Sequence, residues 1–460
     1  MRHIHRIVRM VSLSILVLLI GGTVLTPFTP AVRAAGPWYV STLGSDNNNC
    51  LSPDTTCATI NAAIGKASAG DEIRVATGTY TATAGVEVVL VTQGVKLSGG
   101  WNAAFTTQGG MAVIDGQAAR RGVTIANGVT LGIDHFIFQN GKGDGMGGGL
   151  YNGAGTVTLE DCRVSGNTTY LVDWDKGGGI YNGSGTLTLT RTTVSGNSAY
   201  LGGGIFNQGG ALTLNDSIVN GNTAYNGGGI FNQGGALTLN DSTINGNQVT
   251  NMAKMSGGIW SVDSTVVINH SWITANDGGL INSSGMMTIT ASVIDGNKTG
   301  HYGGGIDNGG VLVVTDSTVS NNAAANDGGG IINSGTATLT NSTVSGNKAS
   351  SGGGIMGLQG SLVVNSSTIS ANTAISGGGA ATSNGTITLR NTILAGNVTL
   401  RNGPDCSGAI GSAGYNLVFN TAGCAFSAGA GDLTGVDPQL GERISTPAYY
   451  PLLPTSPAVD

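Results

Sequence analysis

Apolar residues recur at fixed positions along most of the chain, in step with a repeated asparagine. Six of the nine intervals between successive members of this asparagine series are 25 residues. The positions three, eight and ten places before each asparagine are apolar, as at Val164, Leu159 and Val157. This period of two predicts short β-strands, and a further strand is expected after each glycine cluster, as at 202–207. The series consists of Asn167, Asn197, Asn222, Asn247, Asn276, Asn297, Asn322, Asn347, Asn372 and Asn397.

The repeats hold no segment with the length and apolar spacing of an amphipathic helix, so the chain must coil on β-strands alone. One coil per repeat would pair each residue in parallel with its equivalent at about 4.8 Å and would stack the aliphatic columns into one core. The pattern therefore predicts an all-β fold, a right-handed parallel β-helix solenoid with about 25 residues per coil.

The repeated asparagines are expected to form a structural ladder inside this solenoid. A buried side-chain amide at a sharp corner can bond the backbone and its counterpart in the next coil. Glycine accounts for 80 of the 460 residues because such corners need positive φ and close backbone approach. A second, less regular ladder is predicted at Asn152, Asn182, Asn207, Asn232, Asn282, Asn308 and Asn333.

Both ends of the chain depart from the repeat. Residues 1–34 have the basic start, apolar run and small-residue end of a secretory signal peptide, although an uncleaved membrane anchor is the alternative. Residues 35–121 are expected to form an N-terminal cap and the first coils, with a short capping helix within 57–69. Residues 122–397 form the repetitive coils, the first of them irregular around Ile137 and Asn140, and residues 398–460 form a C-terminal cap.

The five cysteines indicate an oxidising compartment. Cys50 and Cys57 flank one short loop and Cys406 and Cys424 flank another, so two local disulfides are predicted. Cys162 falls in a column otherwise filled by Ser and Thr, and we expect it to be a small buried residue without chemical function. Only 10% of the residues are charged, and no basic patch suggests nucleic acid as a partner. We expect no membrane span in the mature chain.

The repeat, typified by GGGIFN at 227–232 and NDSTINGN at 240–247, resembles the repeats of chlamydial polymorphic outer membrane proteins and of other pectate-lyase-like bacterial β-helix proteins. This resemblance covers about 122–397. The ending resembles the domain called choice-of-anchor Q, through Pro404-Asp405-Cys406, Asp437-Pro438 and the final residues LPTSPAVD. The resemblance implies a secreted or surface-displayed protein of the bacterial envelope.

Catalysis of the pectate-lyase type would need acidic side chains holding calcium together with an arginine, and hydrolysis would need paired aspartates. The position six places before the ladder asparagine places acids and one arginine in a single column, about one strand spacing apart. Each of these residues is expected at a corner that favours Asx turns, so we predict no catalytic residue among them. The column contains Asp161, Arg191, Asp216, Asp241, His270 and Asp316.

Aromatic residues gather beside the nine-residue loop at 168–176. They are predicted to point outward and are our candidate ligand-binding residues, because aromatic faces suit sugar rings and exposed apolar strips mark contact sites. An alternative is that their lateral stacking stabilises the coils beneath a loop. The candidates are Tyr151, Tyr170, Trp174, Tyr181, Tyr200, Phe206, Tyr225, Phe231 and Trp260.

Two acidic residues of the same loop, Asp173 and Asp175, are weak candidates for calcium, and no other cofactor is expected. The sequence therefore favours adhesion or glycan binding without catalysis, with a polysaccharide or another cell-surface component as partner. A polysaccharide lyase or glycoside hydrolase of the pectate-lyase-like fold is the alternative. The aromatic residues without converging acids and a base favour the first hypothesis.

Overall fold

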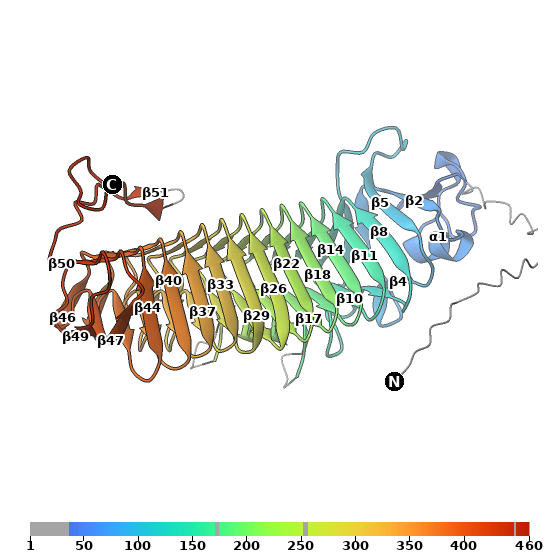
Figure 1. The fold of residues 1–460 in the computed structure, drawn as a ribbon. Helices are drawn as coiled ribbons and strands as arrows, with labels where there is room; N and C mark the ends of the chain where they lie inside the picture. The colour runs from blue at the N-terminus through green and yellow to red at the C-terminus, as the bar shows by residue number, and fades with distance from the viewer. Residues whose placement is uncertain (1–35, 171–173, 252–255, 446–447, 460) are drawn as a thin grey trace, which may run out of the picture.

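The computed structural model describes residues 36–170, 174–251, 256–445 and 448–459, so the predicted signal peptide lies outside the described residues. Three parallel sheets wind around one core and form a right-handed parallel β-helix, which confirms the predicted fold class (Figure 1). Each repetitive coil passes through sheet C, then sheet A, then sheet B, as in β10, β11 and β12.

The strands of each sheet are short. Sheet A comprises β1 (Trp38–Val40), β2 (Glu72–Ala76), β5 (Lys96–Trp101), β8 (Thr130–Asp134), β11 (Thr156–Glu160), β14 (Thr186–Thr190), β18 (Ala211–Asn215), β22 (Ala236–Asn240), β26 (Ser264–Asn269), β29 (Gly285–Thr290), β33 (Val311–Thr315), β37 (Thr336–Thr340), β40 (Ser361–Asn365), β44 (Thr386–Arg390), β47 (Cys406–Ser412) and β49 (Cys424–Phe426). Sheet B comprises β3 (Gly78–Tyr80), β6 (Ala112–Asp115), β9 (Phe136–Gln139), β12 (Arg163–Ser165), β15 (Thr193–Ser195), β19 (Ile218–Asn220), β23 (Thr243–Asn245), β27 (Trp272–Thr274), β30 (Val293–Asp295), β34 (Thr318–Ser320), β38 (Thr343–Ser345), β41 (Thr368–Ser370), β45 (Ile393–Ala395), β48 (Leu417–Val418) and β50 (Leu433–Thr434). Sheet C comprises β4 (Glu87–Val91), β7 (Arg121–Ile125), β10 (Leu150–Asn152), β13 (Ile180–Asn182), β17 (Ile205–Gln208), β21 (Ile230–Gln233), β25 (Ile259–Val262), β28 (Leu280–Asn282), β32 (Ile306–Asn308), β36 (Ile331–Asn333), β39 (Ile355–Gly357) and β43 (Ala380–Thr382), and β47 joins sheets C and A at the C-terminal end.

The core follows the aliphatic columns expected from the sequence. Equivalent residues pair across coils, for example Leu187 with Leu212 and Val194 with Val219, and these side chains are buried. Period-two alternation turns one side of each strand inward and leaves the other side outward. One apolar cluster consequently runs from Trp38 to Val418.

The ten repeated asparagines are buried and linked in order along the solenoid. In all nine steps the side-chain Nδ2 donates to the next Oδ1 over 2.9–3.0 Å. From Asn197 onward, each Oδ1 also accepts the preceding asparagine's backbone N–H, as between Asn197 and Asn222 at 3.0 Å. The glycine clusters make room for this ladder, since a Cβ on Gly204 would lie 2.6 Å from the carbonyl oxygen of Gly229 and 3.0 Å from the Asn222 amide.

The second asparagine ladder is interrupted. Asn152, Asn182, Asn207 and Asn232 are linked at 2.7 Å per step, and Asn282, Asn308 and Asn333 are linked in the same way. Ser261 occupies the register position between the two runs, and its shorter side chain reaches neither neighbour.

The N-terminal end is closed by the capping helix α1 (Ile60–Lys66), whose Ile60 and Ile64 are buried in the core. Thr59 caps it by accepting the backbone N–H of Ala62 over 3.1 Å. The irregular first repeat lies one residue later than predicted from Ile137 and Asn140. Phe138 is the core residue in register with Val164, and Gly141 donates to Asn167 in place of a ladder side chain.

Three further features bear on function. Both predicted disulfides, Cys50–Cys57 and Cys406–Cys424, are formed. Cys162 is buried, and burial raises the pKa of its thiol to about 12. Among the described residues, no helix combines the length and apolar character needed to span a membrane.

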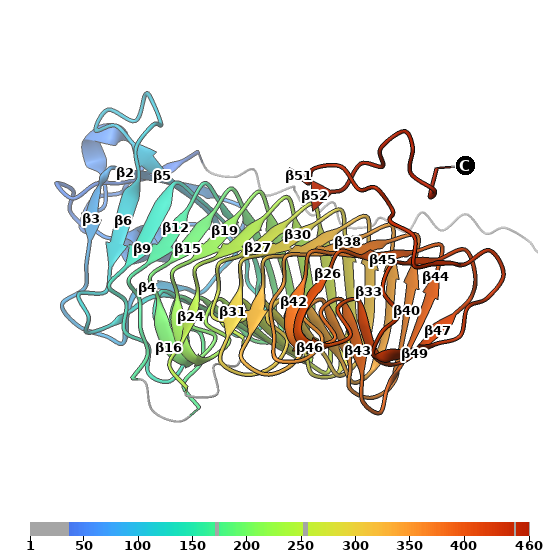
Figure 2. The same ribbon diagram turned by 90° about the vertical axis from the view of Figure 1, so that its left-hand side faces the viewer.

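The last part of the chain returns along the solenoid and forms a two-stranded hairpin, β51 (Ile444–Ser445) with β52 (Ala448–Tyr449) (Figure 2).

Some coils carry an extra strand that the sequence did not predict, between the asparagine ladder and the glycine cluster. These strands pair as β16 (Ser198–Leu201), β20 (Thr223–Asn226) and β24 (Gln248–Val249), as β31 (Lys298–Thr299) with β35 (Ala323–Ala324), and as β42 (Thr373–Ser376) with β46 (Val398–Asn402). They form where the residues that directly follow the ladder asparagines lie side by side in adjacent coils and share backbone hydrogen bonds.

Candidate functional site

Five of the candidate aromatic residues form one stacked column on the outer side of sheet C. They belong to successive strands in register, and their ring centroids lie 5.2–6.0 Å apart. The column points outward from sheet C as predicted, but its three central members are covered, since Phe206 is fully buried and Tyr181 and Phe231 are each 7% exposed. The column consists of Tyr151, Tyr181, Phe206, Phe231 and Trp260.

In most coils a loop follows the ladder asparagine, and we call these loops in adjacent coils the loop row. The loop row covers the aromatic column. Leu201 and Tyr200 pack over the rings, and together they form an apolar cluster separate from the main core. The Nζ of Lys176 lies 4.9 Å from the centre of the Phe206 ring and donates to Gln208 Oε1 over 3.0 Å. Burial lowers the pKa of Lys176. The buried column therefore supports the alternative interpretation, in which stacking stabilises the coils beneath a loop.

Of the remaining aromatic candidates, Tyr170, Trp174 and Tyr225 are exposed, whereas Tyr200 is only partly exposed because it also packs on the buried column. Trp174 is 76% exposed and Tyr170 is 54% exposed. Tyr200 and Tyr225 stack in parallel with ring centroids 4.7 Å apart, and Tyr225 keeps 42% of its surface exposed. The backbone bridge between Thr168 and Ser198 places Tyr170 one coil before Tyr200 in the same row. We call Tyr170, Trp174, Tyr200 and Tyr225 the loop platform.

The ammonium group of Lys142 lies against the loop platform. The Nζ of Lys142 is 4.4 Å from the centre of the Tyr170 ring, within the range of a cation–π contact. The predicted calcium candidate Asp173 lies outside the described residues, whereas Asp175 is buried with its Oδ2 unpaired. Within the described ranges, no group of three or more His, Cys, Asp or Glu side chains is placed to hold a metal ion.

The column of acids and one arginine lies at the corner between sheets A and B. Its residues have left-handed backbone, with φ between 46° at Arg191 and 51° at Asp316, and this conformation explains the frequent Asp and Asn there. Arg191 binds Asp161 with two hydrogen bonds of 2.8 Å and also contacts Glu160, in the preceding coil. Hydrogen bonding to Arg191 lowers the pKa of Asp161. These surface contacts account for the presence of Arg191 in the column without a catalytic role.

A separate titratable group appears where one coil is shorter than the others. The interval between Asn276 and Asn297 is only 21 residues, because Asp277 and the glycines follow the ladder asparagine directly. The missing loop leaves a notch of about 20 Å³ lined by Asp307, His301 and Tyr302. Asp307 occupies the outer column of sheet C between Ile281 and Ile332.

The environment of Asp307 is mostly apolar. Burial raises the pKa of this carboxyl to about 6, and the nearby His301 partly offsets the effect. The rings of His301 and Tyr302 meet edge to face with centroids 4.4 Å apart. Sequence reasoning missed this group, although the 21-residue interval was a signal for it.

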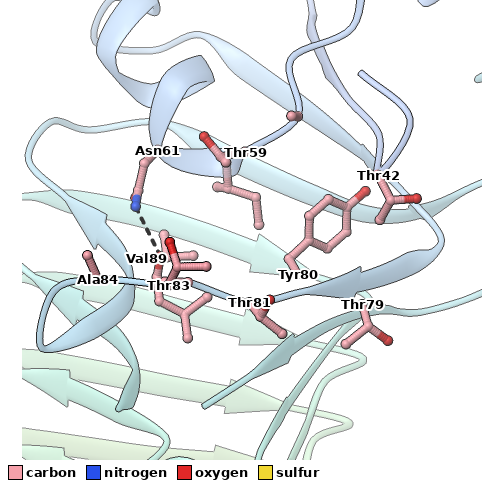
Figure 3. Close-up of a pocket in the computed structure, with 13 residues that line it drawn as sticks. Thr42, Thr59, Asn61, Thr79, Tyr80, Thr81, Thr83, Ala84 and Val89 are labelled. Carbon is pink, nitrogen blue, oxygen red and sulfur yellow. Dashed lines mark hydrogen bonds between the residues drawn. The ribbon is translucent and has the colours of Figure 1, made fainter. Parts of the chain in front are cut away.

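A hollow of about 450 Å³ lies beside α1 at the N-terminal end (Figure 3). Its strongest polar groups already serve the fold. The side chain of Asn61 bonds the backbone of Val88 and Leu90, and the hydroxyl of the buried Tyr80 donates to Ala76 over 2.8 Å. The remaining lining is mainly Thr and Ala, so the hollow presents few fixed polar contacts to a ligand.

No family model and no curated protein matches this chain. Among solved structures, it is similar to the pectate lyase Pel9A, with 17% identity, coverage of 67% of this chain and 75% of that one, and a TM-score of 0.40. It is also similar to XylC in complex with xylose, with 10% identity, coverage of 88% and 87%, and a TM-score of 0.44. The A-module of the Azotobacter vinelandii mannuronan C-5 epimerase AlgE4 is 13% identical, with coverage of 80% and 89% and a TM-score of 0.31.

Proposed function

We propose that this chain is a secreted or surface-displayed β-helix protein of the bacterial envelope that binds glycans without catalysis. The observation that carries the proposal is the loop platform, where Trp174 and Tyr225 expose aromatic faces on a regular scaffold. Aromatic rings supply a large contact area at low conformational cost and stack well on the apolar faces of sugar rings. Placing them on the coils fixes their spacing before a ligand arrives.

Binding to immobilised glycans tests this proposal. We expect Trp174→Ala and Tyr225→Ala each to weaken binding about tenfold, equivalent to about 1.4 kcal/mol. Trp272→Ala is a matched control because Trp272 is a partly exposed aromatic on β27, in another sheet. Equal binding by all three variants, at unchanged thermal stability, would rule out the loop platform as the glycan site.

Asp307 supports a second candidate function, a polysaccharide lyase or glycoside hydrolase. A carboxyl with a pKa of about 6 beside an imidazole can exchange a proton near neutral pH. Its test is release of unsaturated or reducing ends from a panel of acidic and neutral polysaccharides. Activity that disappears in Asp307→Asn would establish this function, whereas absence of product from every polysaccharide would exclude it for that panel.

A further inference from the structure

The C-terminal segment, which comprises residues 438–445 and 448–459, lies over the outer side of sheet B but does not fill the space beneath it. The segment holds its own shape through the hairpin β51–β52, a bridge between Leu440 and Leu452, and a 2.6 Å hydrogen bond from Ser456 to Pro438. It contacts the coils where β52 meets β34. Both ribbon views show this segment returning from the C-terminal end along the solenoid (Figures 1 and 2).

Three hollows of about 440, 370 and 310 Å³ adjoin one another along this part of the solenoid. They share Ser366, and the first two also share Asn391 and Tyr415, so they form one continuous groove. The corner between sheets A and B supplies one wall. The C-terminal segment supplies the facing wall of the first and third hollows, through Leu452 and Pro457 in one and Tyr449 in the other.

The corner wall is a regular row of polar side chains that ends in an aromatic ring. Its residues have left-handed backbone, with φ between 46° and 59°, and occupy equivalent positions in successive coils. Four steps of about 4.8 Å give the row a length of about 19 Å. The row consists of Asp316, Asn341, Ser366, Asn391 and Tyr415.

The groups along this row are suited to bonding hydroxyls. Asn391 donates one hydrogen bond to Ser366 over 3.1 Å, and Asn341 donates one to Asp316. These bonds orient the amides, and each amide retains a second N–H and acceptor capacity on its oxygen. Tyr415 and Tyr449 are 70% and 47% exposed, and their rings provide apolar faces at the groove.

The charges in the groove nearly cancel. The residues that line the three hollows include one acidic residue, Asp316, and one basic residue, Arg390. The groove therefore offers no net charge that would attract a strongly anionic or a strongly cationic ligand. A neutral polymer with many hydroxyls, by contrast, finds amides, hydroxyls and aromatic faces along its length.

We infer that this groove binds an extended segment of a neutral polysaccharide, lying along the solenoid axis between the corner row and the C-terminal segment. This site is independent of the loop platform, which belongs to the row beside sheet C in earlier coils. The two sites can therefore be tested separately. Tyr415 and Tyr449 are expected to stack on sugar rings, and Asn391 is expected to bond sugar hydroxyls.

Titration calorimetry with the full chain tests the inference, using cellohexaose and xylohexaose as neutral probes and oligogalacturonate as an acidic one. We expect at least one neutral probe to bind. Tyr415→Ala and Asn391→Ala should then weaken that binding about tenfold, and Tyr415→Phe should retain most of it. Trp272→Ala and Asn220→Ala are matched exposed controls on sheet B outside the groove and should leave the affinity unchanged.

The opposite results are equally clear. Failure of both neutral probes to bind, or preference for the acidic probe, would overturn the inference. So would unchanged affinity in Tyr415→Ala and Asn391→Ala. Binding that is lost only in Trp174→Ala would support the loop platform and refute the groove, whereas loss only in the groove variants would do the reverse.

Discussion

Asn397 and Asp405 form the last step of the asparagine ladder. The Nδ2 and the backbone N–H of Asn397 both donate to Oδ1 of Asp405, over 2.9 and 3.0 Å. The second carboxylate oxygen accepts the backbone N–H of Asn420 over 2.8 Å. A carboxylate only accepts hydrogen bonds, so it can receive the final donors of the ladder without needing an acceptor in a further coil. The aspartate therefore closes a chain of bonds that runs through ten coils.

Removal of this closing acceptor should destabilise the C-terminal coils. Asp405→Ala leaves three N–H groups without their acceptor, and we expect a loss of about 3 kcal/mol. Asp405→Asn keeps an oxygen at the ladder position and should cost much less. Hydrogen exchange of residues 393–420 checks this locally, and equal protection in the two variants would contradict it.

Within the ladder, Asn222→Ala should cost about 3 kcal/mol. The substitution removes donors to Asn247 and Val194 and an acceptor for Asn197 from a fully buried site. Urea unfolding measures the change. Asn220→Ala is the matched control because Asn220 is exposed on the neighbouring strand, and a similar loss in both variants would argue against the ladder.

The buried aromatic column should behave as core rather than as a binding surface. Phe206→Ala is expected to lower the free energy of unfolding by about 3–5 kcal/mol, because it empties a fully buried site. Phe206→Leu should cost less than half as much. Thermal unfolding compares these variants with Trp174→Ala, which should lose little stability. A larger loss in Trp174→Ala than in Phe206→Ala would reverse our assignment of the two layers.

Stability should depend on the ionisation of Asp307. Its pKa rises from 3.8 to about 6 on folding, so the folded state binds the proton more tightly than the unfolded state. The resulting stabilisation is complete below the unfolded pKa and is lost as the pH rises through about 6, with a magnitude of about 3 kcal/mol. The electrostatic effect of the neighbouring His301 opposes this shift.

Asp307→Asn should remove this dependence. At pH 8 the variant should be more stable than the wild type by about 3 kcal/mol, because no charge is held in the notch, and at pH 4 the two should be nearly alike. Urea unfolding at both pH values measures the difference. His301→Gln is the companion variant and should raise the pKa of Asp307 further, whereas a pH profile unaffected by Asp307→Asn would contradict the buried carboxyl.

Cys162 should resist alkylation while the chain is folded. Its thiol is buried and its pKa is raised to about 12, so little reactive thiolate forms at neutral pH. Iodoacetamide should therefore label it only after unfolding without reduction, and mass spectrometry should then find a single modified cysteine. Labelling of the native protein would show that Cys162 opens to solvent.

Much of the fold follows from the repeat because identical positions in successive coils have identical surroundings. The columns at Val164 and Leu159 and the ladder asparagines each predict one place in the coil, and parallel pairing extends that place to all coils. The prediction for the irregular first repeat was wrong by one residue, because Asn140 has the residue type and the approximate spacing of a ladder asparagine. Backbone register places Gly141 there instead.

Less of the candidate site could be predicted from the sequence. The alternation of each strand shows that Phe206 and Asp307 point away from the main core, yet it contains no information on what lies above them. Loop length decides that point. Leu201 and Tyr200 cover Phe206, whereas the coil that begins at Asn276 has no loop, and this leaves the notch beside Asp307.

Local pattern and its repetition were therefore sufficient for the solenoid, the ladder and the aromatic column, since all three depend on contacts between equivalent residues of neighbouring coils. The covering of the column and the groove beneath the C-terminal segment depend on contacts between unlike segments. Tyr449 and Asn391, for example, lie far apart in the sequence and share no repeat, yet both line the groove. Only packing in three dimensions brings such residues to one surface, because no periodic pairing specifies where a non-repeating segment will rest.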